Sequence, residues 1–273
     1  MQKTFSTPEP VSMHVELGSG NLVVHTDDMG ETVVKVNGRD ADNCVVEQRG
    51  DEIVVLAKQR GGGLFGSSRE LTVHVSMPDD SRLSTKLGSA DVVVQGRLGE
   101  ARLRTGSGDV RVDVIAAPAF VETGSGDVSI DRVAGPLEVR SGSGDVFLED
   151  LGGPANLATG SGDVQVTTAR GPLQVKSGSG DLRVRQAFED VALSTASGHL
   201  AVDRLQRGQV VAKNVSGDIR VGIPGGVPVW TDISSMTGSV RSNLDGVGEP
   251  SEGQEFIELR AKTVSGDISL EQV

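Results

Sequence analysis

Residues 124–163 read GSGDVSIDRVAGPLEVRS GSGDVFLEDLGGPANLAT GSGD, so the corner sequence Gly-Ser-Gly-Asp returns twice with an 18-residue period. The corner recurs along the chain and ends each time at an aspartate, at Asp109, Asp127, Asp145, Asp163 and Asp181. A fixed period of this length is typical of repeat proteins, in which each unit stacks on the next. One 18-residue unit therefore decides the fold.

A second turn signal lies halfway between the acidic corners, at Pro118, Pro136, Pro154 and Pro172. Glycine and proline both end regular structure, and the half-units they bound are too short for a helix. Within each half the apolar residues alternate with polar ones, as in Val128, Ile130 and Val133 after one corner. This spacing predicts short strands with one face inward and one face in water.

Equivalent aliphatic residues in every 18-residue unit predict an all-β fold, a single-stranded parallel β-helix (β-solenoid) whose coils stack about 4.8 Å apart. A left-handed hexapeptide helix also has an 18-residue coil, but it needs an inward aliphatic residue at every sixth position, and Glu122 breaks that series. The known preference of parallel crossover connections favours a right-handed coil.

The repeat register extends beyond the five regular corners and then loosens. Ser89-Ala90-Asp91 continues it backward by one 18-residue period and Ser197-Gly198-His199 forward by one, with His in place of Asp. After that the corners at Asp218, Gly238-Ser239 and Asp267 are separated by irregular intervals. We expect a flexible segment at Asn243–Gln254 and a final strand at Val264–Leu270.

The N-terminal part has strand-like runs without a common 18-residue register, at Met13–Leu17, Leu22–His25, Thr32–Val36, Val45–Gln48, Ile53–Ala57 and Leu71–Val75. Gly18-Ser19-Gly20-Asn21 resembles the later corners and suggests an outlying coil, while Arg49–Glu52 is typical of a hairpin turn. We therefore predict two regions, a β-rich capping region at residues 1–85 and the β-helix repeat domain at residues 86–273.

The composition excludes several classes of protein. A single cysteine cannot form a disulfide scaffold, and 26 Lys and Arg against 38 Asp and Glu give a net charge of -12, which argues against nucleic-acid binding. The hydrophobic fraction of 36% is too low for a transmembrane segment. Residues 1–8 carry no secretory signal pattern, so we expect a cytoplasmic location, with surface association left open.

The stacked corner aspartates are the sharpest candidate site. Stacking places the carboxylates of Asp109, Asp127, Asp145, Asp163 and Asp181 about 5 Å apart along one edge. Such a column could bind Ca²⁺, which prefers oxygen ligands. The alternative, which we favour, is that each aspartate caps its own turn by accepting backbone N–H bonds, with no metal or other cofactor bound.

The remaining motifs point to structure rather than catalysis. Gly61–Gly66 matches G-x-G-x-x-G, but the following residues alternate like a strand where a dinucleotide site needs a helix. Cys44 lies in an apolar run, and the four histidines have no metal-ligand or triad spacing. With one Trp and no Tyr, a sugar-cleaving groove is hard to build. We predict that the chain is not an enzyme.

The repeated Gly-Ser-Gly-Asp-Val units occur together with an opening Phe5–Val11, the segment Arg97-Leu98-Gly99, and the late segments Val229–Asp232 and Ser242–Asp245. This combination resembles a bacterial domain family of unknown function known by the name "putative adhesin", or β-strand repeat-containing protein, and is most similar to its actinobacterial branch. The resemblance covers essentially the whole chain. It implies a single-stranded β-helix with an adhesin-like role, and no catalytic residues.

Together these observations predict a non-enzymatic β-helix scaffold or binding module. Its partner would be a protein or a component of the cell envelope. Two alternatives remain open at this point: a self-assembling structural polymer that stacks through the end near Val264–Leu270, and a surface adhesin stabilised by Ca²⁺.

Overall fold

The computed structural model describes residues 1–57, 71–246 and 256–273, and these form strands together with one short 3-10 turn, η1 (Ala41–Asn43). The predicted all-β class is confirmed. Contacts divide the chain into two compact units, residues 1–136 and residues 137–273. The boundary expected at residue 85 follows the character of the sequence rather than these contacts, and it stays a prediction.

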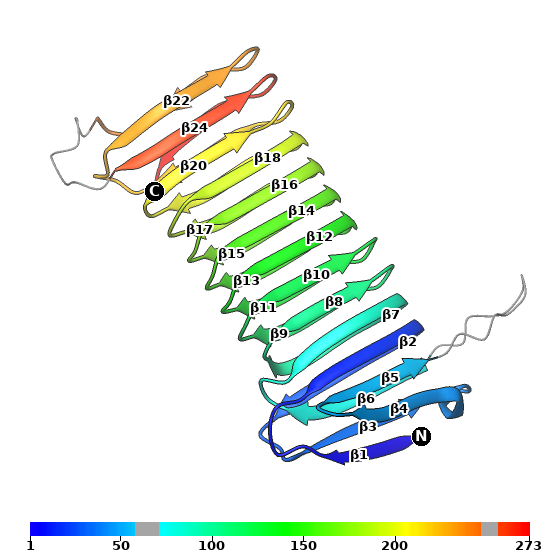
Figure 1. Cartoon of the computed structure of the whole chain (residues 1–273). Helices are drawn as coiled ribbons and strands as arrows, with labels where there is room; N and C mark the ends of the chain where they lie inside the picture. The colour runs from blue at the N-terminus through cyan, green and yellow to red at the C-terminus, as the bar shows by residue number, and fades with distance from the viewer. Residues whose placement is uncertain (58–70, 247–255) are drawn as a thin grey trace, which may run out of the picture. The chain divides into compact units, whose positions relative to one another are not determined.

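In the second unit each 18-residue repeat forms one coil of two strands (Figure 1). The strands after the proline corners are β12 (Leu137–Ser143), β14 (Ala155–Ser161), β16 (Leu173–Ser179) and β18 (Val191–Ser197). Those after the acidic corners are β13 (Val146–Leu151), β15 (Val164–Ala169), β17 (Leu182–Ala187) and β19 (Leu200–Leu205). Each of these strands pairs in parallel with its equivalent in the next coil, as Leu148 with Val166, which confirms a parallel β-helix.

The core of the second unit is a stack of small aliphatic side chains. In β17 the alternate residues Leu182 and Val184 and the last residue, Ala187, are at most 1% exposed. The intervening Arg183 and Arg185 point to solvent. Because the parallel register superimposes equivalent residues, aliphatic side chains lie above aliphatic side chains from coil to coil, and the buried apolar area stabilises the stack.

The last three coils of the second unit are stacked out of sequence order. They are formed by β20 (Gly208–Lys213) with β21 (Ile219–Ile223), by β22 (Val229–Ser235) with β23 (Val240–Ser242), and by β24 (Ile257–Thr263) with β25 (Ile268–Gln272). β24 lies between β20 and β22 and pairs with both (Figure 1). Likewise, β25 pairs with β21 on one edge and β23 on the other. The coil that comes last in the sequence is thus inserted between the two before it.

The final strand differs from the prediction in position and in surroundings. Residues 264–267 form the corner between β24 and β25, and the last strand runs from Ile268 to Gln272. Val264 is apolar, as a strand residue would be, yet it is 42% exposed at the corner. The end expected near Val264–Leu270 is therefore not an end at all, since β25 is covered on both edges.

The first unit contains further coils of the same kind. They are formed by β8 (Ala101–Thr105), β9 (Val110–Ile115), β10 (Ala119–Thr123), β11 (Val128–Val133) and the long β7 (Arg82–Leu98). The strand β2 (Ser12–Asp27) pairs in parallel with β7, with Ser19 opposite Ser89 and Asn21 opposite Asp91. This pairing confirms the outlying coil that was expected at residues 18–21.

The other edge of β2 is covered by a β-rich cap. β5 (Glu52–Ala57) and β6 (Leu71–Pro78) pair in parallel with β2, and three antiparallel strands follow: β3 (Glu31–Asn37) on β6, β1 (Gln2–Ser6) on β3, and β4 (Cys44–Arg49) on β5. The predicted hairpin turn is confirmed, with Arg49 opposite Glu52 and Gly50 at a φ of 67°. Switching from parallel to antiparallel pairing ends the coil pattern.

Candidate functional site

The corner aspartates form a hydrogen-bonded ladder between coils. In the second unit the backbone N–H of Asp163 donates to Asp145 Oδ1, that of Asp181 to Asp163 Oδ1, and that of His199 to Asp181 Oδ1, each at 2.8 Å. In the first unit Asp109 N–H donates to Asp91 Oδ1 at 2.9 Å and Asp127 N–H to Asp109 Oδ1 at 3.1 Å. The predicted residues are therefore brought together within each unit.

The ladder corrects one detail of the sequence interpretation. Each aspartate was expected to cap its own turn, whereas Asp163, for example, accepts the N–H of the equivalent residue in the next coil. The reason is the parallel register, which places the equivalent corner of the next coil within hydrogen-bonding distance. These carboxylates therefore hold neighbouring coils together.

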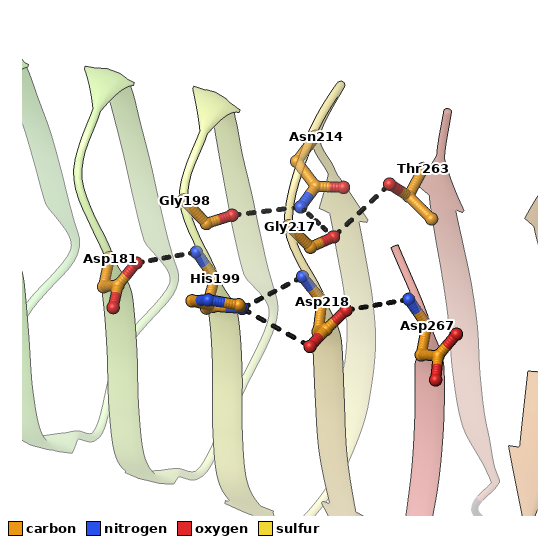
Figure 2. A network of polar contacts seen from close by, with 8 residues as sticks. All are labelled: Asp181, Gly198, His199, Asn214, Gly217, Asp218, Thr263 and Asp267. Carbon is orange, nitrogen blue, oxygen red and sulfur yellow. Dashed lines mark hydrogen bonds and ion pairs between the residues drawn. The ribbon is translucent and has the colours of Figure 1, made fainter. Parts of the chain in front are cut away.

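The ladder continues through the irregular coils in spatial rather than sequence order (Figure 2). Asp218 N–H donates to His199 Nδ1 at 3.0 Å, and Asp267 N–H donates to Asp218 Oδ1 at 2.8 Å. Ser239 N–H donates to Asp267 Oδ1 at 2.9 Å. His199 thus takes the place of an aspartate with its Nδ1 as acceptor, which leaves the proton of a neutral ring on Nε2.

A second network lies beside the ladder, at the glycines of the same corners (Figure 2). The Asn214 amide Nδ2 donates to Gly198 O at 3.0 Å and to Gly217 O at 2.8 Å, and the Thr263 hydroxyl donates to Gly217 O at 3.4 Å. Asn214 is only 7% exposed, and its amide joins two successive corners by hydrogen bonds. Sequence reasoning missed it, although an alignment of the coils places it in the inward column of Thr195 and Ser177.

The corner glycines are required by close backbone approach. Gly198 has a φ of +142°, and a Cβ added there would lie 2.1 Å from the carbonyl oxygen of Gly180 in the preceding coil. No side chain fits at that distance, and L-residues rarely adopt this φ. The glycine excess of the sequence thus reflects coil-to-coil contact at the corners.

The carboxylates are not arranged as a metal centre. Across residues 1–57, 71–246 and 256–273, no group of three or more His, Cys, Asp or Glu side chains is placed to hold a metal ion. One oxygen of each of Asp145, Asp163 and Asp181 already accepts a backbone N–H.

The electrostatics of the ladder are visible at Asp267. The hydrogen bond from the Ser239 backbone N–H holds the pKa of the Asp267 carboxyl below its usual range, and the charge of Arg241 lowers this pKa by a smaller amount.

The outward face of β14, β16, β18 and β20 carries a different pattern. Asn156, Gln174, Ala192 and Val211 lie in register across these strands and line a shallow groove of about 280 Å³, with the proline corners and Gln209 along one side. Asp190, the acidic residue of the lining, accepts the backbone N–H of Gln209 at 2.9 Å. Side-chain amides over an apolar floor are suited to hydrogen-bonding a ligand laid across the strands.

Two lysines lie beside this groove. Lys176 is two residues beyond Gln174 and Lys213 two residues beyond Val211, so both project from the same face as the groove. Both are exposed, and neither forms an ion pair within the described part of the chain. Their positions lie two coils apart, about 10 Å. In a chain of net charge -12, this is a local positive region.

The other candidate residues have structural positions. Cys44 is 7% exposed, and burial raises the pKa of its thiol, which fits the expected packing role. His14 contacts Glu16 at 3.2 Å on a coil of the first unit, while His199 belongs to the ladder. The glycine motif at residues 61–66 lies outside the described residues.

The described part of the chain contains no helix with the length and hydropathy that a membrane span requires.

Comparison with known proteins gives a family and a set of solved structures. The family model described as Toastrack DUF4097 matches residues 12–189 and again residues 170–271. No curated protein matches the chain. The assignment to an actinobacterial branch stays a prediction.

Several solved structures are similar to the chain, three of them from Bacteroides fragilis and Parabacteroides distasonis. One is a "putative adhesin" from Bacteroides fragilis, 13% identical, covering 100% of this chain and 96% of its own, with a TM-score of 0.46. A "putative adhesin" from Parabacteroides distasonis is 12% identical with the same coverage and a TM-score of 0.35. A "putative lipid binding protein" from that species is 11% identical, covering 100% and 96%, with a TM-score of 0.33.

Proposed function

This chain belongs to the Toastrack DUF4097 family, and from that premise we propose that it is a non-enzymatic β-helix scaffold that binds a protein or a cell-envelope component. The amide-lined groove on β14, β16, β18 and β20 is the binding face. An adhesin-like role is what the resemblance of the sequence implies. A cytoplasmic location is part of the proposal, with the cell surface as the alternative.

The observation that carries this proposal is the amide-lined groove together with the two lysines beside it. The corner carboxylates are engaged by backbone N–H groups, and on the strands after the acidic corners Arg183 pairs with Asp203 at 2.8 Å. By contrast Lys176, Lys213 and the amide of Gln174 have no side-chain partner within the residues described. Groups that the fold leaves uncommitted are the ones available to a ligand.

The chemistry of the groove narrows the class of ligand. Side-chain amides both donate and accept hydrogen bonds, and the two ammonium groups favour an anionic ligand. An extended acidic segment of a protein or envelope polymer could contact the amides along the groove and place its negative groups near Lys176 and Lys213. The groove is open to solvent, so we expect recognition without chemical change of the ligand.

The experiment compares two matched variants in pull-downs from cytosolic and envelope fractions of the native cell. Ala192→Arg fills the groove with a long side chain, whereas Ala201→Arg places the same side chain on the outward face of β19 in the same coil. We expect a partner captured by the wild-type chain to be lost with Ala192→Arg and kept with Ala201→Arg. Equal capture by both variants would place binding elsewhere, and turnover of a substrate by the pure protein would refute the non-enzymatic role.

A further inference from the structure

The coil formed by β22 and β23 has one uncovered edge. β22 pairs only with β24 and β23 pairs only with β25 among the described residues. Each strand therefore leaves a row of backbone N–H and C=O groups on its other edge without a strand partner. Natural edge strands usually avoid this exposure with charges, prolines or bulges. The stretch from Val229 to Ser242 contains no proline and no lysine.

The apolar core is also uncovered at this coil. Val240 stacks on Ile268, which stacks on Ile219, yet Val240 is 49% exposed while the other two are at most 1% exposed. On the other strand Thr231 and Ile233 occupy the inward positions above Leu259 and Ala261, and both are accessible to solvent. Met236, between the two strands, is 76% exposed. The aliphatic stack therefore ends with apolar side chains that no further coil of the described chain covers.

The charges of this coil favour a like partner over an acidic one. Residues 229–242 contain one acidic and one basic side chain, and both are directed back to the covered coil. Asp232 pairs with Lys262 at 2.9 Å and Arg241 with Asp267 at 3.5 Å. The uncovered edge is thus neutral, although the whole chain carries a net charge of -12. Two such edges can meet without the repulsion that their acidic faces would cause.

We propose that this coil is the interface with a second copy of the same chain, related by a two-fold axis. The two copies of β22 would pair antiparallel, and the same coil of each copy would cover the open core of the other. With Thr231 on the axis, Val229 of one copy lies opposite Ile233 of the other, so inward apolar residues meet inward apolar residues. This proposal is independent of the proposed function of the groove.

A two-fold interface closes the assembly at two copies. An isologous contact uses the same surface on both partners and leaves no free edge for a third copy. A head-to-tail polymer that continued the parallel stacking would need a second uncovered parallel coil to receive β22. In the described residues of the first unit, β2 is covered by β5 and β6, and the strands left with a single partner, β1 and β4, belong to antiparallel pairs. The geometry therefore favours a dimer over the stacked polymer that the sequence left open.

The test is the molar mass of the full chain by light scattering and sedimentation across a hundredfold range of concentration. We expect about twice the monomer mass of 28.4 kDa at the high end, without larger species. Trp230 is the single tryptophan and is 51% exposed on β22, so its fluorescence should shift to longer wavelength as the dimer dissociates on dilution. A monomer at every concentration, or mass that keeps rising with concentration, overturns the proposal.

Two variants locate the interface. Val240→Lys and Met236→Lys introduce like charges at the proposed contact, and each should weaken dimerisation at least tenfold. Met236 is so exposed that its substitution should leave the thermal melting of the monomer unchanged. Ala201→Lys, on the outward face of β19, serves as the control and should dimerise like the wild-type chain. Unchanged dimerisation of both edge variants would refute this interface.

Discussion

At the scale of single residues, the aspartates that looked most like ligands are connectors between coils. Asp163 Oδ1 accepts the N–H of Asp181, and the same bond is repeated from corner to corner. A carboxylate that the sequence pattern offers to a cation is, in the structure, the acceptor for a fixed backbone donor. Repetition of a residue in a solenoid therefore reflects a repeated backbone geometry before it reflects a ligand.

Substitution of Asp163 separates these two roles. Asp163→Ala removes the acceptor of the Asp181 N–H and should lower the free energy of unfolding by about 1 kcal/mol. Asp163→Asn keeps an oxygen in the same place and should lose less than half as much. Urea denaturation of the three proteins measures the difference. If Asn were as damaging as Ala, the charge rather than the hydrogen bond would matter, and the cation hypothesis would regain support.

At the scale of elements, each coil depends on the backbone contact at its glycine corner. Gly198→Ala would place a methyl group 2.1 Å from Gly180 O and force an L-residue into a φ of +142°. We expect a loss of about 3 kcal/mol or more in the free energy of unfolding. Gly30→Ala is the matched control, since no atom lies within 4 Å of the added Cβ, and it should be nearly neutral. Calorimetric melting of both variants provides the measurement.

The strands could be predicted from the sequence because their apolar residues recur with a fixed spacing. The 18-residue period fixes the pairing of β13 with β15 and of β16 with β18, and alternation fixes which residues are buried. The stacking order of the last coils could not be predicted, because the strands that pair with each other need not follow each other in the sequence. Nothing between Ser239 and Asp267 in the sequence indicates that Asp267 stacks directly on Asp218.

The candidate site was predicted in part for the same reason. The corner aspartates were found because they repeat, whereas Asn214 occurs once and became visible only when its amide was seen between Gly198 and Gly217. The groove of β14 to β20 was equally hidden, because its two amides are followed by Ala192 and Val211 in one row across the strands, and its lysines alternate with small residues in the next row. Such rows can be read only after the register is known.

At the scale of the whole molecule, stability should not depend on a divalent cation. The described residues hold no group of side chains placed to bind one, and one oxygen of each of Asp145, Asp163 and Asp181 already accepts a backbone N–H in the ladder. Adding EDTA should leave the melting temperature unchanged, and adding Ca²⁺ afterwards should not raise it. A lower melting temperature that Ca²⁺ restores would contradict this and favour the Ca²⁺-stabilised adhesin.

The inserted coil also has a consequence for synthesis on the ribosome. β22 and β23 emerge before β24 and β25, yet their pairing partners in the coil below are those later strands. Residues 229–242 therefore have none of their final strand partners until residues 257–272 have been translated. A nascent chain that stalls within this interval lacks the strands against which β22 and β23 pack, so the last 17 residues decide when this end of the stack can form.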